Sequence, residues 1–312
     1  MRVLVTGAAG FLGSHLVDAL LARGDEVVAL DHRLRGKCLS DAVLARVRPI
    51  QSDIYDAGVV AAASNGCAAI FHCAAVVGVD AYTSQPARTM EVEEVGLRNV
   101  CQAALAQKTT RVVYCSSSAV YGATTAPELS ETDPAAPNSN YGIAKRFGEL
   151  YLAGRYSEHG LQSSSLRIFN IYGPRQDERL VIPRFIRHAR ANESIVIYGD
   201  GRQTRDFVYV ADVVETALAC ADRGNGCEIV NACSGHETSV RELAETVVAL
   251  TQSSSAIVLR EQPSARTAFE VDRCLGNPAR MLALRGNGKT TPLKEGLART
   301  AAATTPKAAV HG

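Results

Sequence analysis

Two residues in the segment NYGIAKRFGELY, residues 140–151, have the types and spacing of an acid–base pair. Tyr141 and Lys145 are four residues apart, so on a helix they share one face and reach a common ligand. A phenol with a pKa near ~10 is a poor base at neutral pH, but an adjacent ammonium group stabilises its anion. The spacing therefore predicts a tyrosine whose phenolate can act as a general base. The alternative is an amphipathic helix with an exposed lysine.

A glycine-rich turn opens the chain. In VLVTGAAGFLGSHL, residues 3–16, Gly7, Gly10 and Gly13 follow an apolar run and begin an amphipathic helix. Glycine lets a pyrophosphate approach backbone N–H groups at a helix N-terminus, where the helix dipole favours an anion. The alternative is a simple tight turn between a strand and a helix. The position of the turn at the start of the chain, and Asp31 at the end of the next apolar run, favour dinucleotide binding.

Two acidic residues bear on how the dinucleotide is held. Asp31 would accept the ribose hydroxyls and repel a 2′-phosphate, which favours NAD over NADP. Arg33 lies close enough in sequence to accommodate such a phosphate, so NADP stays open. Asp53, after the third apolar run, would either bind the adenine amino group or cap the end of its strand.

The elements that must position these residues are read from hydrophobic periodicity. Short β-branched runs alternate with helical patterns, which predicts a parallel sheet covered on both faces. We expect strands at residues 3–6, 26–30, 47–51, 69–73, 111–115 and 164–169, and helices at residues 13–23, 90–107 and 141–159. From residue 173 the elements become shorter. The predicted organisation is a cofactor domain at 1–172, to which some later segments return, a smaller substrate-binding domain at 173–300, and a disordered tail at 301–312.

Composition excludes several classes of protein. The chain has 312 residues, of which 46% are hydrophobic, enough for a large core. Its 33 basic and 32 acidic side chains give a net charge of +1, so we expect no nucleic-acid partner. The nine cysteines form neither a CxxC pair nor a zinc pattern, and no apolar run spans a membrane or forms a signal peptide. We therefore expect a cytoplasmic protein with reduced cysteines, no metal and no membrane contact.

Taken together, these motifs resemble the extended short-chain dehydrogenase/reductase family, in particular its branch of nucleotide-sugar epimerases and dehydratases. The likeness covers roughly residues 1–297. Besides the glycine turn and the Tyr141–Lys145 pair, it is carried by FHCAA (71–75), SSSAVYG (116–122), RIFNIYGPRQ (167–176), YGDGRQTRDFVYVADV (198–213) and VNACSG (230–235). The family implies an α/β fold with a Rossmann-type doubly wound parallel sheet and a smaller C-terminal substrate-binding region. It also implies a homodimer joined through the helices at 90–107 and 141–159.

The resemblance implies roles for individual residues. Ser117, placed by its distance from Val120, would hydrogen-bond the C4 oxygen of the sugar, Tyr141 would take the C4 hydroxyl proton, and Lys145 would hold the nicotinamide ribose. NAD would accept the C4 hydride, giving a 4-keto sugar. The residues expected to bind NAD are Gly7, Gly10, Phe11, Leu12, Gly13, Asp31, His32, Asp53, Ile54, Cys73, Ala74, Ala75, Tyr141 and Lys145. The residues expected to bind the nucleotide sugar are Val77, Ser117, Ser118, Asn170, Arg205 and Arg266.

The reaction that follows depends on the residues after Ser117. Dehydratases of the family have an Asp-Glu pair there, and decarboxylases usually keep the Glu, whereas this chain has Ser118 and Ala119. Neither has the basicity of a carboxylate. We therefore expect a 4-epimerase acting on a UDP-hexose or a UDP-hexuronic acid. A 4-ketoreductase, a dehydratase or decarboxylase with unusual residues, and a dinucleotide-binding regulator without turnover stay open.

Three features depart from the family or have a second interpretation. Glu93 stands where the family commonly has Asn, beside the active site or in solvent. The segment after Arg266 reads Thr267-Ala268-Phe269, where the family usually has Pro-Gly-Asp. Arg205 would clamp a diphosphate with its guanidinium group, or form a surface ion pair with Asp206. His72 and Cys73 are expected to end a buried strand beside the cofactor, and not to form a metal or redox pair.

Overall fold

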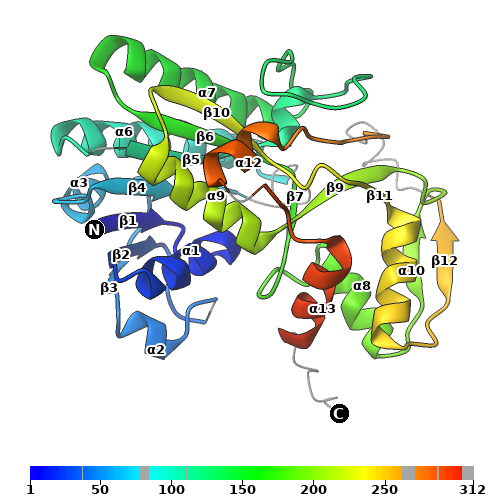
Figure 1. The fold of residues 1–312 in the computed structure, drawn as a ribbon. Coiled ribbons are helices and arrows are strands. Elements are labelled where there is room, and N and C mark those ends of the chain that lie inside the picture. Colours follow the sequence, from blue (N-terminus) through cyan, green and yellow to red (C-terminus); the bar gives the residue numbers. More distant parts are fainter. Residues whose placement is uncertain (37, 77–83, 110, 262–270, 287, 304–312) are drawn as a thin grey trace.

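The fold is built on one large parallel sheet (Figure 1). The computed structural model describes residues 1–36, 38–76, 84–109, 111–261, 271–286 and 288–303. The sheet has seven strands in the order β10-β6-β5-β4-β1-β2-β3. Their bounds are β1 (Arg2–Thr6), β2 (Glu26–Asp31), β3 (Arg48–Gln51), β4 (Ala69–His72), β5 (Arg111–Ser117), β6 (Ser163–Ile168) and β10 (Cys227–Ala232). All the strands expected from the sequence are present, and β10 is added to them.

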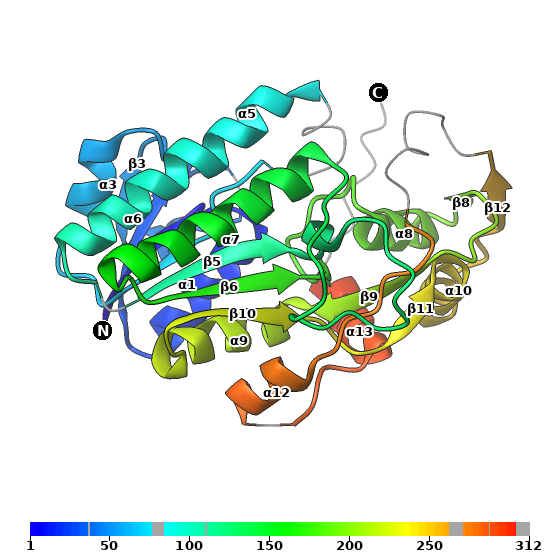
Figure 2. The same ribbon diagram turned by 90° about the horizontal axis from the view of Figure 1, so that it is seen from above.

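Both faces of the sheet are buried under helices, which explains the continuous apolar runs of its strands. Along β1, Val3 and Val5 face one hydrophobic core and Leu4 faces the other. The first core lies under α1 (Phe11–Ala22) and α9 (Val210–Arg223). The second lies under α3 (Ala57–Ala63), α6 (Leu97–Ala106) and α7 (Asn140–His159). Figure 2 shows α6 and α7 running side by side along this second face.

The helix predicted at 90–107 consists of three consecutive segments. It begins as α5 (Pro86–Glu91), passes through a π-helical turn (Val92–Gly96), and continues as α6. A π turn inserts an extra residue into a helix and is frequent at functional sites. Its presence changes which side chains of this segment face the protein interior.

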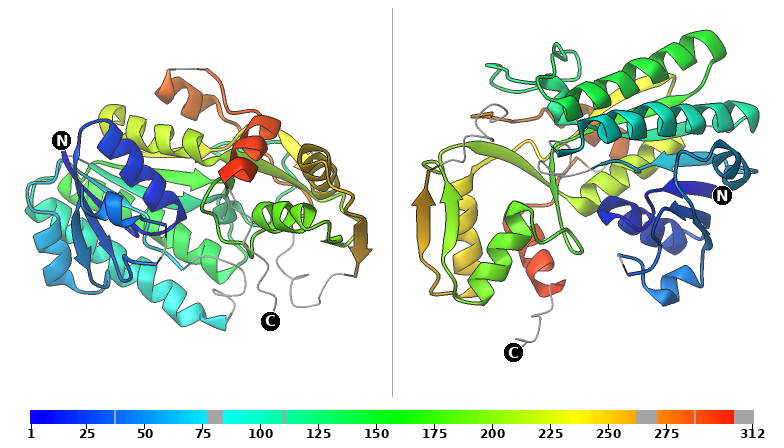
Figure 3. Two further views of the ribbon diagram at one scale, coloured as in Figure 1. Left: turned by 90° about the horizontal axis from the view of Figure 1, so that it is seen from below. Right: turned by 180° about the vertical axis from the view of Figure 1, so that it is seen from behind.

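The second group of elements lies beside the large sheet, as two further views show (Figure 3). It contains a three-stranded sheet, β11-β9-β7, and the parallel pair β12-β8. The bounds are β7 (Asn170–Tyr172), β8 (Ile195–Tyr198), β9 (Thr204–Tyr209), β11 (Glu237–Ser239), β12 (Ile257–Arg260), α8 (Val181–Arg190), α10 (Val240–Thr251) and α13 (Leu293–Ala303). The described residues also include the short helices α2 (Asp41–Leu44) after β2 and α12 (Ala279–Arg285) beside α9, and a 3₁₀ turn (Ser118–Tyr121) after β5.

The chain end departs from its prediction. Helix α13 continues to Ala303, and Ala301 packs into the core, so the prediction of a disordered tail is wrong for residues 301–303. Residues 304–312 lie outside the described residues. The domain boundary at 172 stays a prediction, and β10 shows that the chain returns to the large sheet after building β7 to β9. No helix in the described ranges has the length and apolar character needed to cross a bilayer.

The topology determines where a ligand can bind. The strand order reverses direction between β1 and β4, and loops on the two sides of this point separate at the carboxyl edge of the sheet. Such a switch point in an open α/β sheet forms the crevice in which ligands bind. The segments after β1, β2, β3 and β4 therefore meet at one edge, beside the end of β5.

Candidate active site

The glycine turn after β1 has the shape needed to approach a pyrophosphate. Gly7 has φ +65°, and a Cβ atom there would lie 2.7 Å from the backbone N of Ala74. Gly13 touches the same turn, since a Cβ on it would lie 2.1 Å from the Gly7 carbonyl oxygen. Gly10 is the N-cap of α1, and no side chain among the described residues caps this helix. The first N–H groups of α1 are therefore open to an anion, as dinucleotide binding requires.

The acidic residue after β2 fastens this turn. Asp31 is buried, and its Oδ2 accepts a hydrogen bond from the Ala9 N–H at 3.1 Å while Oδ1 accepts one from Arg33 N–H at 3.0 Å. The exposed His32 places Nδ1 3.2 Å from the same carboxylate. Asp31 thus ties β2 to the glycine turn, and its expected contact with ribose stays a prediction.

The residues after β3 and β4 complete the edge. Asp53 Oδ1 accepts a hydrogen bond from Tyr55 N–H at 3.2 Å, so the cap at the strand end is present, and the adenine contact stays a prediction. The Ile54 carbonyl accepts a hydrogen bond from Asn99 at 3.0 Å, which connects this loop to α6. Cys73, Ala74 and Ala75 directly follow β4 and lie against Gly7 through Ala74.

His72 behaves as a core residue. Its Nδ1 lies 2.7 Å from the Thr6 hydroxyl, and its ring stacks on Tyr114 with centroids 5.9 Å apart. Burial lowers its pKa to about 3, with Lys145 contributing, so the ring is neutral at physiological pH. Nε2 has no partner among the described residues. Across those residues, no group of His, Cys, Asp and Glu is arranged to hold a metal ion.

The serine and the tyrosine expected to act together are adjacent. Ser117 ends β5, and its Oγ accepts a hydrogen bond from Ala119 N–H at 3.2 Å. Helix α7 begins at Asn140 because Ser139 caps it, accepting a hydrogen bond from Gly142 N–H at 3.1 Å. This places Tyr141 in the first turn, where its side chain forms a hydrogen bond with Ser117.

The lysine one turn later is buried and paired. Lys145 Nζ lies 2.5 Å from Glu93 Oε1 and 5.8 Å from the centroid of the Tyr141 ring. The alternative of an exposed lysine is therefore wrong, and Glu93 faces the active site and not solvent.

Charge and burial oppose each other at Tyr141. Burial raises its pKa, Lys145 lowers it, Glu93 raises it, and the hydrogen bond with Ser117 lowers it; the result lies above the ordinary value. We expected Lys145 to lower the pKa of Tyr141. It does so, but burial and the carboxylate beside it outweigh the ammonium charge.

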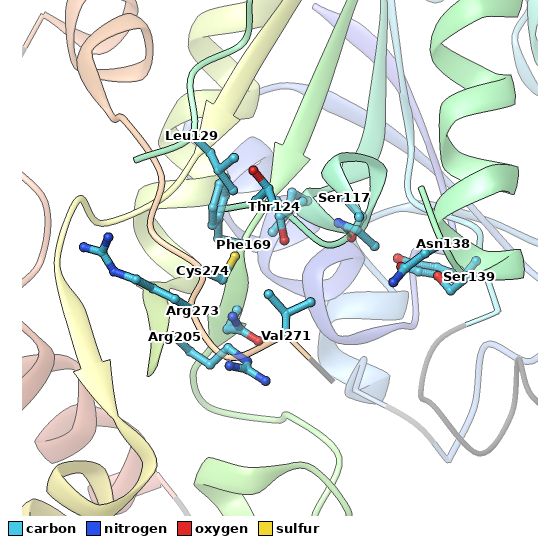
Figure 4. A pocket seen from close by; sticks show the side chains of 16 residues that line it. Ser117, Thr124, Leu129, Asn138, Ser139, Phe169, Arg205, Val271, Arg273 and Cys274 are labelled. Carbon is cyan, nitrogen blue, oxygen red and sulfur yellow. Dashed lines mark hydrogen bonds between the residues drawn. The ribbon is translucent and has the colours of Figure 1, made fainter. Parts of the chain in front are cut away.

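A cavity of about 250 Å³ opens in front of Ser117 and Tyr141 (Figure 4). It lies between the ends of β5 and β6 and the segment at 271–274. Its lining residues are Ser117, Ser118, Ala119, Gly122, Thr124, Leu129, Asn138, Ser139, Tyr141, Ile168, Phe169, Asn170, Arg205, Val271, Arg273 and Cys274. Among these described residues two are cationic and none is acidic. The cavity therefore suits an anionic ligand with a polar, uncharged reacting end.

The positive side of the cavity has two arginines. Arg205 on β9 lies in the lining, as Figure 4 shows, and Asn170 at the start of β7 lies there too. Asp206 is fully buried, and its carboxylate accepts hydrogen bonds from Ser234 and from the N–H groups of Gly235 and Gly276. Arg205 thus lines the cavity, whereas Asp206 holds together the buried segments at residues 234–235 and 276.

Arg273 lines the cavity but was not among the binding residues predicted from the sequence. It reaches the cavity from the segment before α12 and forms a bidentate ion pair with Glu237, with N–O distances of 2.7 and 2.8 Å. Val77 and Arg266 lie outside the described residues, as does the departure at 267–269. Arg273 lies seven residues after Arg266, the expected second clamp, and this position was the one hint of its role. The segment VDRC around it has no pattern that distinguishes a binding arginine.

A glycine turn at a switch point, with Ser117, Tyr141 and Lys145 at the neighbouring strand end, is the arrangement expected of an NAD-binding protein of the short-chain dehydrogenase/reductase type. The model of the NAD-dependent epimerase/dehydratase family matches residues 3–233. The chain belongs to this family, and NAD is its cofactor.

Relatives with different activities are similar to the chain. It is 38% identical over 267 residues to a UDP-N-acetyl-alpha-D-glucosaminuronate decarboxylase of Bacillus cytotoxicus, covering 82% of each chain. It is also 38% identical over 251 residues to a UDP-glucose 4-epimerase of Mycolicibacterium smegmatis, covering 78% of this chain and 80% of that one. The crystal structure of a UDP-glucose 4-epimerase with UDP-glucose from Thermotoga maritima has a TM-score of 0.90 at 28% identity, covering 97% and 98% of the two chains. The family is thus shared by decarboxylases and epimerases.

Proposed function

We propose that the protein is an NAD-dependent 4-epimerase of a nucleotide sugar, with a UDP-hexose or UDP-hexuronic acid as substrate. The observation that supports this is the lining of the cavity: none of its described residues is a carboxylate. The thiol of Cys274 bonds with Ser118, and burial raises the pKa of this thiol to about 11, so it is neutral at physiological pH. Apart from Tyr141, which would serve the C4 hydroxyl, no residue at these lining positions offers the basicity that elimination of water would need.

The residues present are sufficient for oxidation at C4. Ser117 would donate to or accept from the C4 oxygen, and Tyr141 as the phenolate would take the C4 hydroxyl proton. NAD⁺, held at the glycine turn after β1, would supply the hydride acceptor for C4 and a positive charge that favours the Tyr141 phenolate. Arg205 and Arg273 would hold the diphosphate through their guanidinium groups, with Asn170 beside them. The 4-keto sugar would then turn in the uncharged end of the cavity and regain the hydride on its opposite face.

Decarboxylation is the second candidate, and the similarity to the Bacillus cytotoxicus enzyme favours it. Oxidation of a uronic acid at C4 places a ketone β to the C6 carboxylate, which is attached to C5. Such a β-keto acid loses carbon dioxide without a catalytic base, so the lining seen here would permit it.

Product analysis separates the two candidates. The purified protein is incubated with UDP-glucose, UDP-N-acetylglucosamine and their C6-oxidised forms, without added cofactor, and the products are identified by proton NMR. We expect the C4 epimer of one of them and no net change in NAD. A UDP-pentose with release of carbon dioxide would establish the second candidate, and a 6-deoxy product would contradict both.

We also propose that the protein is a homodimer joined through α7 and the helix predicted at residues 90–107. Three of the exposed large hydrophobic side chains lie on α7: Ile143 (45% exposed), Leu150 (56%) and Tyr156 (40%). Ile143 and Leu150 are seven residues apart and so share one face of the helix. An apolar stripe of this kind on a surface helix indicates a protein interface.

The dimer proposal predicts that Leu150→Glu weakens self-association by on the order of 100-fold, because it would bury an unpaired charge. Light scattering coupled to gel filtration measures the mass. Leu259→Glu is the matched control, since Leu259 is 43% exposed on β12, away from α7. A monomeric wild type, or an equal effect of both substitutions, would contradict the proposal.

We propose a reducing compartment, the cytoplasm, as its location. The structure describes all nine cysteines, and each is a thiol outside any disulfide. Cys73 and Cys115 bring their sulfur atoms to 3.4 Å without forming a disulfide. Oxidising compartments favour disulfide formation, so thiols this close are typical of proteins kept reduced.

A further inference from the structure

A buried carboxylate stands behind the catalytic lysine. Glu93 belongs to the π turn between α5 and α6, and 1% of its side chain is exposed. Its neighbour Glu94 has 56% of its side chain exposed and faces Arg98 at 4.0 Å. The π turn thus directs one of two adjacent glutamates into the protein and the other to solvent.

The contacts of Glu93 form a built site. Oε1 pairs with Lys145 Nζ at 2.5 Å, and Oε2 accepts a hydrogen bond from the Tyr114 hydroxyl at 2.5 Å. Room for this hydroxyl comes from Gly148 on α7, where a Cβ would lie 2.4 Å from the Tyr114 oxygen. Lys145 Nζ also lies 4.9 Å from the centroid of the Tyr114 ring. Three elements therefore fix one carboxylate against the ammonium group.

We propose that Glu93 is a positioning residue that fixes Lys145 and offsets its charge, so that the Tyr141–Lys145 pair works in a higher pH window than it would beside an uncharged side chain. The proposal rests on the proposed function only through its first step, oxidation at C4. Glu93 is not among the residues that line the cavity, so it acts through Lys145 and does not contact the sugar.

The charges around the pair support this. Among the described residues, the titratable groups that act on Tyr141 or Lys145 are Glu93 of the π turn, Tyr114 and Cys115 of β5, and His72 and Cys73 at and just after the end of β4. Glu149 of α7 acts on Tyr114. His72 is neutral, as described above. Burial lowers the pKa of Lys145, and Glu93 raises it above the ordinary value. Glu93 also raises the pKa of Tyr141, on top of the effect of burial and against that of Lys145.

Removal of the Glu93 carboxylate charge should therefore lower the pKa of both Tyr141 and Lys145. A phenol ionises more readily without a neighbouring anion, and an ammonium group loses its proton more readily. Activity that needs the Tyr141 phenolate and the Lys145 ammonium rises through the first ionisation and falls through the second. Both limbs of the pH profile should move to lower pH, by about one unit each.

The test compares four variants in the full-length protein. The pH dependence of kcat/KM is measured for Glu93→Gln, Glu93→Asn, Glu93→Asp and Glu94→Gln, with thermal melting to confirm folding. We expect the profile to shift to lower pH for Gln and Asn, and to stay near that of the wild type for Asp, which keeps the charge. Glu94→Gln removes an exposed charge from the same turn and should leave the profile unchanged. Lower rates without a shift, or an equal shift for Glu94→Gln, would overturn the proposal.

A second readout needs neither substrate nor cofactor. Tyrosine labelled with carbon-13 at Cζ reports its ionisation by NMR, and Tyr141→Phe assigns the signal. In the ligand-free wild type, Tyr141 should titrate above ~10, and in Glu93→Gln at a lower pH than in the wild type. A wild-type titration well below ~10 would overturn the proposal even if no variant folds. If the products show decarboxylation, the pH profile is measured on that reaction instead. Failure of the epimerase proposal can then be distinguished from failure of the proposal for Glu93.

Discussion

Tyr141→Phe should lower kcat by about 1000-fold while the affinity for the nucleotide sugar stays within a few-fold of the wild type. Phenylalanine keeps the ring that packs at the start of α7 but lacks the hydroxyl that bonds to Ser117 and would receive the C4 proton. The arginines and the asparagine on the other side of the cavity are unchanged. Steady-state kinetics and calorimetric titration of the nucleotide sugar measure the two quantities separately.

The matched control for this substitution is Tyr151→Phe on the same helix. Tyr151 stacks on Phe147 with ring centroids 5.9 Å apart and is not part of the cavity lining. Its loss of a hydroxyl should leave kcat within about two-fold of the wild type. Equal kcat for Tyr141→Phe and the wild type would mean that another group takes the proton. A parallel loss of binding would mean that Tyr141 has a structural role.

Glu149→Ala should destabilise the fold by about 3–5 kcal/mol, because it leaves a buried arginine without its partner. Arg167 on β6 donates to both carboxylate oxygens of Glu149 at 2.9 Å, and both side chains are buried. The Ser116 hydroxyl donates to the same carboxylate at 2.7 Å, and Arg146 at 2.9 Å. This network ties α7 to β5 and β6 next to Ser117. Urea denaturation of the variant measures the loss of free energy of unfolding.

The double variant Glu149→Met with Arg167→Met is the control, since an apolar pair of similar volume removes both charges. It should recover most of the stability lost in Glu149→Ala, and a double variant as unstable as the single one would contradict the explanation.

Acid should reveal the same network. Burial by itself raises the pKa of Glu149, but Arg167, Ser116 and Arg146 bring it below the ordinary value. A carboxyl group with a lowered pKa stabilises the fold above its unfolded pKa of about 4.3, and this stability is lost as the pH falls through the folded value. The difference between the wild type and Glu149→Ala should therefore shrink below about pH 4.

The sequence predicted the sheet well because its strands are buried on both faces. Continuous apolar runs such as VVAL before Asp31 are too short for a typical helix, and this length favours a strand buried on both faces. The expected catalytic residues could also be predicted from the sequence. Tyr141 and Lys145 have a helical spacing that the sequence displays directly, and Ser117 was identified through the resemblance to the family, from its distance to Val120.

The remaining features depend on contacts between distant segments. Glu93 and Glu94 are identical neighbours, and only the π turn decides which one meets Lys145. The pair of Glu149 and Arg167 joins a helix to a strand and follows no period. Arg273 lines the cavity and pairs with Glu237 at the start of β11, a contact between two segments 36 residues apart. None of these contacts has a signature in spacing or composition.

The late arrival of β10 has a consequence for synthesis on the ribosome. Strand β6 ends at Ile168, but its outer neighbour in the sheet is made only when Cys227–Ala232 emerges. Until then β6 has an unpaired edge, and Asn231 is absent as the acceptor for the Tyr121 hydroxyl at 2.7 Å. While β7 to α9 are being translated, the amino-terminal part of the chain is therefore an incomplete sheet whose edge strand β6 has unpaired backbone groups. Chains stalled before β10 has left the ribosomal exit tunnel should bind chaperones or aggregate, while those stalled far enough beyond residue 232 for β10 to have emerged can close the sheet.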